Sequence, residues 1–397
     1  MSIIRLGECN KNMMHILVGG ISKLIVNIIL YLFPQGAKLN NHPFLLGINA
    51  GLGMSLAIIP YILVEKITKP KKEKILNNNK YIEDLKKRKS SGIKRERYLI
   101  LFLCAFLDFT QKVLVFLFSY SIANNVWIFN IVFLNVFTSM LMNNPIYRHQ
   151  LVSSGIMIFF GIALNVVNLY KMTVNDIPIL FLSIFIEIIY SLAIVLAKYG
   201  MDHAFCSPFE ITFYEGIMGL IMNIIFLIIS TNVPLSPHFK YKNILKISDY
   251  KGKMYLDNFY TYIDNFDFTE FLLFTITMFG RVLFNLFSHL TIRYFTSSHV
   301  VFLLIMGEVT LDWSEKDADE VILTAIIFFI EFLMLLVFCE IIELNFCGLE
   351  VNTRRNIQER VKKEQYEDDD DDSIRESKDI WDGLELSSES SSSINMF

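Results

Sequence analysis

The stretch FLCAFLDFTQKVLVFLFSYS, residues 102 to 121, places an acid, an amide and a base inside a run of apolar side chains. Asp108 and Lys112 are four residues apart with the acid first, so a helix would bring them to one face in the favourable order for an ion pair. Asp108 also follows Tyr98 by ten residues, which is about 15 Å along a helix axis. The pair is therefore expected near the middle of an apolar helix that is long enough to cross a bilayer.

A charged residue at the centre of a membrane helix is costly. Asp or Lys costs about 2.5–3.5 kcal/mol there, whereas each Leu, Ile, Phe or Val returns only about 0.3–0.6 kcal/mol. Two charges facing lipid would cancel most of the drive of the helix to insert. The face that carries Asp108 and Lys112 is thus expected to point at protein or water, where the pair either holds helices together or contacts a substrate.

Other ionisable residues lie inside apolar runs. Glu308 in LLIMGEVTL could carry a coupling proton, or it could be the permanent partner of Arg281. Lys23 and Asn27, also four residues apart, give the first apolar run a polar face, unless Lys23 extends toward the bilayer surface instead.

The segment SPFEITFYEG, residues 207 to 216, combines a helix start with two candidate ligand contacts. Ser207 and Glu210 have the spacing of a capping box, with Pro208 at the first helical position, so capping is the expected role of Glu210. Tyr214 and Glu215 lie one turn further along the helix, where capping does not account for them.

The whole chain of 397 residues is 53% hydrophobic with a mean hydropathy of +0.44, which is too apolar for a soluble domain of average composition. Ten apolar runs have the length of a membrane-spanning helix. The sequence therefore predicts an all-α polytopic membrane protein with ten transmembrane helices, near 16–33, 44–64, 98–120, 124–142, 151–169, 177–197, 208–230, 270–292, 297–313 and 321–343. Five cysteines without paired spacing indicate neither a disulfide framework nor a zinc site, and no cofactor is expected.

Charge outside these runs predicts the orientation. Residues 65–97 are dense in Lys and Arg, which places this loop in the cytoplasm. With ten helices the N-terminal residues 1–15 and the acidic tail 344–397, which is expected to be disordered, are cytoplasmic as well. The loop 231–269 then lies on the lumenal or extracellular side, although it contains several lysines that count against this topology.

Two pairs of segments are similar to one another. HPFLLGINAG (42–51) matches SPFEITFYEG (207–216) at an offset of 165 positions, and KVLVFLFSY (112–120) matches RVLFNLFSH (281–289) at an offset of 169. The matches lay residues 16–169 over 177–343, and because each unit has an odd number of helices the two five-helix repeats must be inverted. Lys112 and Arg281 take matched positions, and two such cations would suit a phosphate-bearing or other anionic substrate.

This arrangement, with the stretches LAKYGMDHAFCSPFEITFYEGIMG and TSSHVVFLLIMGEV, resembles the drug/metabolite transporter superfamily and, within it, the EamA-like, nucleotide-sugar transporter-like solute carriers. The resemblance implies a central cavity, alternating access without ATP, exchange of a nucleotide sugar for a nucleoside monophosphate, and a Golgi or other endomembrane location. The cavity motifs of fungal GDP-mannose carriers are only partly present. Phe213 and Tyr214 are retained, but Glu215 and Gly216 replace two asparagines, which disfavours GDP-mannose itself.

The sequence thus predicts a secondary-active transporter of a small metabolite. Carriage of amino acids, cations or drug-like metabolites, as in relatives of the chloroquine-resistance transporter, is the alternative, and a non-transporting receptor or scaffold is a weaker one. Without GxSxG, HExxH or His-rich metal spacing, an enzyme is not expected. The expected partners are the lipid bilayer and a small molecule but no nucleic acid, and a homodimer is allowed. The candidate substrate-binding residues are Lys23, Asn27, Asp108, Lys112, Tyr214, Glu215, Arg281, Asn285 and Glu308.

Overall fold

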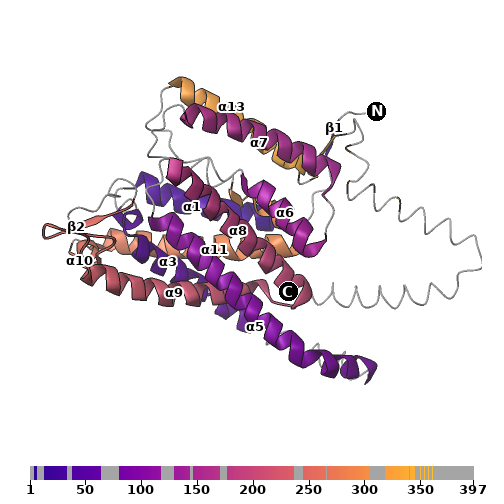
Figure 1. The fold of residues 1–397 in the computed structure, drawn as a ribbon, viewed down its shortest axis with the longest axis horizontal. Helices are drawn as coiled ribbons and strands as arrows, with labels where there is room; N and C mark the ends of the chain where they lie inside the picture. Colours follow the sequence, from indigo (N-terminus) through magenta and orange to yellow (C-terminus); the bar gives the residue numbers. More distant parts are fainter. Residues whose placement is uncertain are drawn as a thin grey trace, which may run out of the picture.

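The computed structural model describes residues 4–6, 13–33, 38–63, 80–117, 129–143, 146–169, 177–236, 245–264, 266–301, 303–304, 318–338 and 340–344, together with Leu349, Thr353, Asn356 and Arg360. These residues are mostly helical, and the long helices pack side by side in a bundle (Figure 1). Two small two-stranded sheets lie at the margins of the bundle.

The long helices follow the predicted apolar runs closely. They are α1 (Met13–Leu32), α3 (Pro43–Ser55), α5 (Lys80–Leu117), α6 (Asn130–Met142), α7 (Arg148–Leu169), α8 (Ile177–His203), α9 (Pro208–Asn232), α11 (Phe268–Tyr294) and α13 (Ala318–Phe338). Shorter elements are α10 (Phe259–Ile263) and the 3-10 helix η3 (Ser297–His299). Strand β1 (Ile4–Leu6) pairs with β4 (Ile342–Leu344), and β2 (Ser248–Tyr250) pairs with β3 (Lys253–Tyr255), both antiparallel.

Five helices in the described part of the chain are long and apolar enough to cross a membrane. They are Pro43–Leu63, in which a turn at 56–57 joins α3 to a further helical stretch at 58–63, together with Arg95–Leu117, Leu180–His203, Pro208–Asn232 and Phe268–Tyr294. Large apolar side chains cover the outer faces of these helices, as on α9, where Ile221, Ile224, Ile225, Ile228 and Ile229 are all exposed. Exposed apolar surface of this extent is typical of proteins that contact lipid, and it favours a multi-pass membrane protein.

Several helix boundaries differ from the prediction, and one of them is the end of α8, which extends to His203 instead of stopping near Ala197. Helix α5 begins at Lys80 rather than near Tyr98, because residues 80–97 are rich in Lys, Arg and Glu, which favour helix without favouring lipid. Helix α13 ends at Phe338 rather than near Glu343, because Glu340 has a left-handed backbone (φ 58°) that stops the helix before β4. The predicted span 297–313 is described only as far as Leu304.

Helices α3 and α9 approach each other backbone to backbone where they cross. A Cβ atom added to Gly51 would lie 2.6 Å from the backbone nitrogen of Leu220, and one added to Gly216 would lie 2.4 Å from that of Ser55. Small residues allow helices to approach closely where lipid removes the hydrophobic driving force for association. The two glycines therefore set the distance between α3 and α9.

Substitution at this crossing should destabilise the bundle. We expect Gly216→Ala to cost about 1–3 kcal/mol, because its methyl group would meet backbone rather than a flexible side chain. Gly219→Ala is the matched control on the same helix, since a Cβ there meets nothing within 4 Å. Thermal unfolding of both variants in detergent should show a lowered melting temperature for Gly216→Ala alone. Equal melting temperatures of the two variants would contradict this account of the crossing.

Candidate functional site

The acid and the base of the opening stretch, Asp108 and Lys112, lie between helices of the bundle. Asp108 is 8% exposed, and its Oδ2 lies 2.7 Å from Nζ of Lys112, so the ion pair predicted from their spacing forms. Nζ of Lys112 also donates to Oδ1 of Asn285 on α11 at 3.3 Å and contacts Sδ of Met54 on α3 at 3.1 Å. Three helices thus meet at one ammonium group, and the charged face of α5 points at protein.

Arg281 lies one helical turn before Asn285. Its guanidinium carbon is 5.0 Å from the centre of the Phe116 ring on α5, a cation–π distance, and the backbone carbonyl of Arg281 accepts a hydrogen bond from Asn285 Nδ2 at 2.8 Å. Lys112 therefore reaches from α5 to α11, and Arg281 reaches from α11 to α5. The structure brings these two candidate residues together with Asp108 and Asn285.

Glu215 belongs to the same buried region through a residue that the sequence analysis did not select. His289 Nε2 lies 3.3 Å from Glu215 Oε1, and His289 Nδ1 lies 2.9 Å from Thr212 Oγ1. Asp108 is within electrostatic range of both Glu215 and His289. The spacing of Arg281, Asn285 and His289 at intervals of four was the available signal, because it places all three on one face of α11.

The remaining candidates lie elsewhere. Lys23 on α1 donates to the carbonyl of Leu304 at 3.2 Å and lies 5.8 Å from the Phe284 ring centre, so it joins α1 to α11 and to residues 303–304. Asn27 lies one turn further along α1. Tyr214 is 37% exposed and lines a separate pocket. Glu308 lies outside the described residues.

That pocket has a volume of about 350 Å³ and lies where α9 begins. It is lined by Ile58, Tyr61, Arg97, Tyr98, Glu210, Phe213 and Tyr214. Arg97 Nε donates to Glu210 Oε1 at 3.2 Å, and Arg97 Nη2 donates to Glu210 Oε2. Glu210 also completes the capping box with Ser207, which confirms its predicted role. Tyr214 lines the pocket, whereas its neighbour Glu215 faces His289 and belongs to the central cluster, which is formed by Asp108, Lys112, Glu215, Asn285 and His289.

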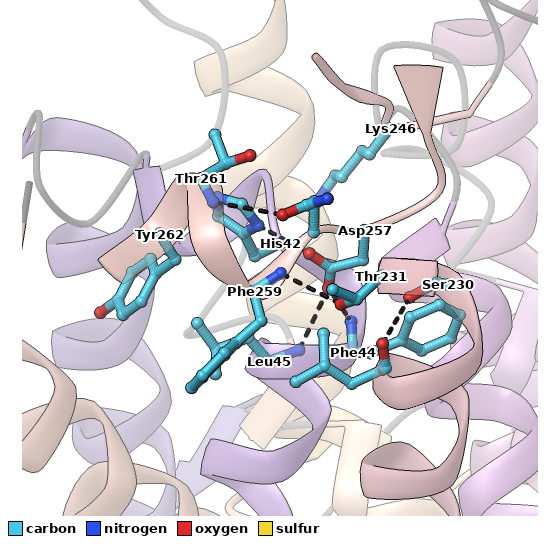
Figure 2. Close-up of polar contacts among 12 residues, drawn as sticks. His42, Phe44, Leu45, Ser230, Thr231, Lys246, Asp257, Phe259, Thr261 and Tyr262 are labelled. Carbon is cyan, nitrogen blue, oxygen red and sulfur yellow. Dashed lines mark hydrogen bonds and ion pairs between the residues drawn. The ribbon is translucent and has the colours of Figure 1, made fainter. Parts of the chain in front are cut away.

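Residues 245–264, between α9 and α11, lie over the opposite end of the bundle (Figure 1). Figure 2 shows the carboxylate of Asp257 at the start of α3. Its Oδ2 accepts from the backbone nitrogens of Phe44 (2.8 Å) and Leu45 (3.3 Å), and its Oδ1 lies 2.6 Å from His42 Nδ1. Asp257 is fully buried, and it satisfies helix-terminal N–H groups that no residue of α3 reaches.

Two lysines attach the same segment to the bundle. Lys246 Nζ donates to the backbone oxygen (2.7 Å) and side-chain oxygen (3.0 Å) of Asn40, and its backbone nitrogen donates to the carbonyl of Leu117 at the end of α5. Lys38 Nζ donates to the backbone carbonyl of Tyr262 in this segment at 3.2 Å, and it pairs with Glu270 at the start of α11 at 2.8 Å. Burial, with a further contribution from the positive charge of Arg281, lowers the pKa of Lys246 to about 8. Lys246 thus lies within electrostatic range of Arg281.

No family model and no curated protein matches this chain. The class of protein is therefore defined by the molecule alone: a helical, multi-pass membrane protein with paired charges buried in its centre. Among the described residues, no group of three or more His, Cys, Asp or Glu side chains could hold a metal ion.

Removal of the carboxylate of Asp257 should loosen this end of the bundle. We expect Asp257→Ala to lower the free energy of unfolding by about 1–2 kcal/mol, because the first N–H groups of α3 lose their acceptor. Asp249→Ala, at an exposed position of the same segment, should leave the melting temperature unchanged. A melting temperature for Asp257→Ala equal to that of the wild type would refute the capping role.

Lys246 should make stability depend on pH in the alkaline range. Its pKa falls from 10.5 to about 8 on folding, so between these values the unfolded chain binds the proton that the folded chain has lost, and stability rises with pH. Below about pH 8 the lysine is charged in both states, so the folded state bears the full free-energy cost of burying the charged ammonium group. The rise should be absent in Lys246→Met and retained in Lys251→Met, an exposed lysine of the same segment, when thermal unfolding is measured at several pH values.

Proposed function

We propose that this protein is a secondary-active carrier of a small anionic metabolite, built from two inverted five-helix repeats and related to the drug/metabolite transporter superfamily. The observation that carries the proposal is the pair of reciprocal contacts between α5 and α11. The alignment of 112–120 with 281–289 matches Lys112 with Arg281 and Phe116 with Asn285. If each residue is replaced by its counterpart in the other repeat, the Lys112–Asn285 contact therefore becomes the Arg281–Phe116 contact.

The crossing of α3 and α9 behaves in the same way. Both helices begin with proline, at Pro43 and Pro208, which the repeat matches. With the same offset, the close approach of Gly51 to Leu220 and that of Gly216 to Ser55 also exchange. Independent reciprocal contacts are what a two-fold relation between halves requires, and they are not expected from composition.

The packing of whole helices follows the same relation. If α1, α3 and α5 correspond to α8, α9 and α11, each contact between helices should have a counterpart in which the halves are exchanged. The contacts α1–α11 and α5–α8, α3–α11 and α5–α9, and α3–α5 and α9–α11 occur in such pairs, whereas α8–α11 has no comparable counterpart between the described parts of α1 and α5. The packing of whole helices thus supports the two-fold relation for these three pairs. Inverted repeats of this kind place a substrate site at the interface of the halves, near the bilayer midplane.

Transport by alternating access needs two ends that open in turn. In the expected topology, with both termini cytoplasmic, the segment 245–267 covers the outer end of the bundle, and the pocket at Arg97 opens toward the cytoplasm. Tyr214 and Glu215 connect that pocket to the central cluster. The described conformation then corresponds to an inward-facing carrier with a closed outer end.

The substrate class follows from the facing cations. Lys112 supplies a compact charge and Arg281 a planar fork, a combination that suits phosphate or carboxylate. An anionic group would compete with Asp108 for Lys112. A nucleotide sugar that exchanges for a nucleoside monophosphate in a Golgi or other endomembrane fits the resemblance noted above. A carrier of cationic or drug-like metabolites is the second candidate, favoured by Asp108 and Glu215 in the same cluster.

Uptake into proteoliposomes tests this proposal. The panel should contain nucleotide sugars, nucleoside monophosphates, amino acids and organic cations. We expect one anionic member to be taken up, and Arg281→Ala or Lys112→Met to reduce that uptake about tenfold or more, as for the loss of a charge-assisted hydrogen bond. Arg95→Ala, at the exposed end of α5, is the matched control and should transport normally.

The other outcomes decide between the candidates. Uptake of an organic cation that survives Arg281→Ala but not Asp108→Asn would support the second candidate and overturn the anionic one. No uptake of any panel member above protein-free liposomes, with protein shown to be folded by its melting curve, would count against transport of these metabolite classes.

A further inference from the structure

Glu215 and His289 form a buried acid–imidazole pair between α9 and α11. Their exposed fractions are 3% and 6%, and the second carboxylate oxygen of Glu215, Oε2, has no hydrogen-bond partner among the described residues. A buried carboxylate with one oxygen unsatisfied is costly if it is charged. The protonation of the pair therefore matters to the stability of the site.

Thr212 determines which nitrogen of His289 carries a proton. The Thr212 hydroxyl lies 2.9 Å from the carbonyl oxygen of Pro208, and a carbonyl can only accept, so the single hydroxyl proton is donated there. The hydroxyl oxygen is left as an acceptor toward His289 Nδ1, at 2.9 Å. Both contacts are satisfied together only if Nδ1 carries hydrogen.

The fixed tautomer leaves one proton to be shared between the two residues. With hydrogen on Nδ1, neutral His289 presents a lone pair on Nε2 to Glu215, so Glu215 must be a carboxylic acid to donate. In the other arrangement, an imidazolium donates from Nε2 to a carboxylate. Each arrangement places one proton between Nε2 and Oε1, which lie 3.3 Å apart, within ion-pair distance if the imidazole is protonated. Without that proton a lone pair would face a buried carboxylate, with no hydrogen bond between them.

We propose that Glu215 and His289 are a proton-binding site, set by Thr212, that couples transport to a pH gradient. The binding of the proton stands on the geometry alone, whereas the coupling rests on the proposed function. The charges near the pair determine whether the proton and the substrate move in the same direction or in opposite directions. Asp108 lies within electrostatic range of the pair and holds Lys112. Loss of the proton adds a negative charge beside these residues and opposes an anionic substrate, so proton and anion should bind together and move in the same direction.

Other charged or titratable groups lie on the elements packed against this pair. They are Arg97, Cys104, Asp108 and Lys112 on α5, Glu210 and Tyr214 on α9, Arg281, Arg293 and Tyr294 on α11, Glu187, Tyr190, Lys198 and Tyr199 on α8, and His15 and Lys23 on α1, while α3 (Pro43–Ser55) has none. Glu187 accepts a hydrogen bond from Asn130 on α6. Arg97 is paired with Glu210, and Lys198 with Asp202 at 3.3 Å. Asp108 is therefore the acid through which the pair is expected to act.

The tautomer can be measured without a substrate. Nitrogen NMR of the full chain in lipid, with labelled histidine and the His289 signals assigned by their loss in His289→Gln, distinguishes the two ring nitrogens. We expect Nδ1 of His289 to stay protonated throughout a pH titration while Nε2 changes. In Glu215→Gln, whose amide can donate to Nε2 directly, the proton affinity of His289 should fall about tenfold or more, which is one pH unit at the midpoint.

Thr212 provides a matched pair of variants for the same measurement. Thr212→Ser keeps the hydroxyl and should behave as the wild type. Thr212→Val removes it, so a neutral ring with hydrogen on Nε2 can donate to the carboxylate, and this second tautomer should appear. A wild-type His289 with bare Nδ1 when neutral, or an unchanged midpoint in Glu215→Gln, would overturn the proton site.

Proteoliposomes test the coupling separately. For whichever nucleotide sugar or nucleoside monophosphate is taken up, we expect a pH gradient with acid outside to accelerate uptake in the wild type. The ratio of gradient-driven uptake to counterflow should fall in Thr212→Val and be retained in Thr212→Ser. An equal ratio in both variants would overturn the coupling. If no member of the panel is transported, the proposed function fails, and the NMR titration still decides the proton site.

Discussion

The structure depends on one constraint: a charge inside an apolar helix bundle must have a partner from the protein, because lipid supplies none. The partners come from different places in the chain, and this makes them structural links. Lys112 connects α5 to α11, Arg97 connects α5 to α9, and His289 connects α11 to α9. The removal of one member would leave an unpaired buried charge, which costs more than the pair contributes. Ionised residues therefore determine which helix faces must meet.

The close approach of helices depends on small residues rather than on charged pairs. Lipid tails are as apolar as leucine, so apolar side chains give helices little preference for one another within a bilayer. Gly51 and Gly216 allow α3 and α9 to touch through their backbones, and the exposed isoleucines of α9 remain on the outside. Charged pairs and glycines together orient each helix about its own axis. The central cluster at Asp108 is the place where both conditions are met.

Local spacing in the sequence predicted much of this arrangement, and long-range contacts were beyond it. The ion pair of Asp108 and Lys112 and the capping box at Glu210 need only a helical repeat, so both were predicted correctly. Asp257 caps α3 from 213 residues away, and no local pattern indicates such a contact. The start of α5 was missed for a different reason: hydropathy ends the apolar run near Tyr98, but helix propensity continues to Lys80.

The two ends of the α3–α9 pair are held by different chemistry, and this difference bears on how a carrier would move. Helix α9 is capped by its own Ser207 and Glu210, so its first turn stays satisfied whatever the surrounding segments do. Helix α3 is capped by Asp257, which belongs to the segment covering that end. Displacement of the segment would expose the first N–H groups of α3 together with His42. The cap of α3 therefore depends on the position of this segment, whereas the cap of α9 does not.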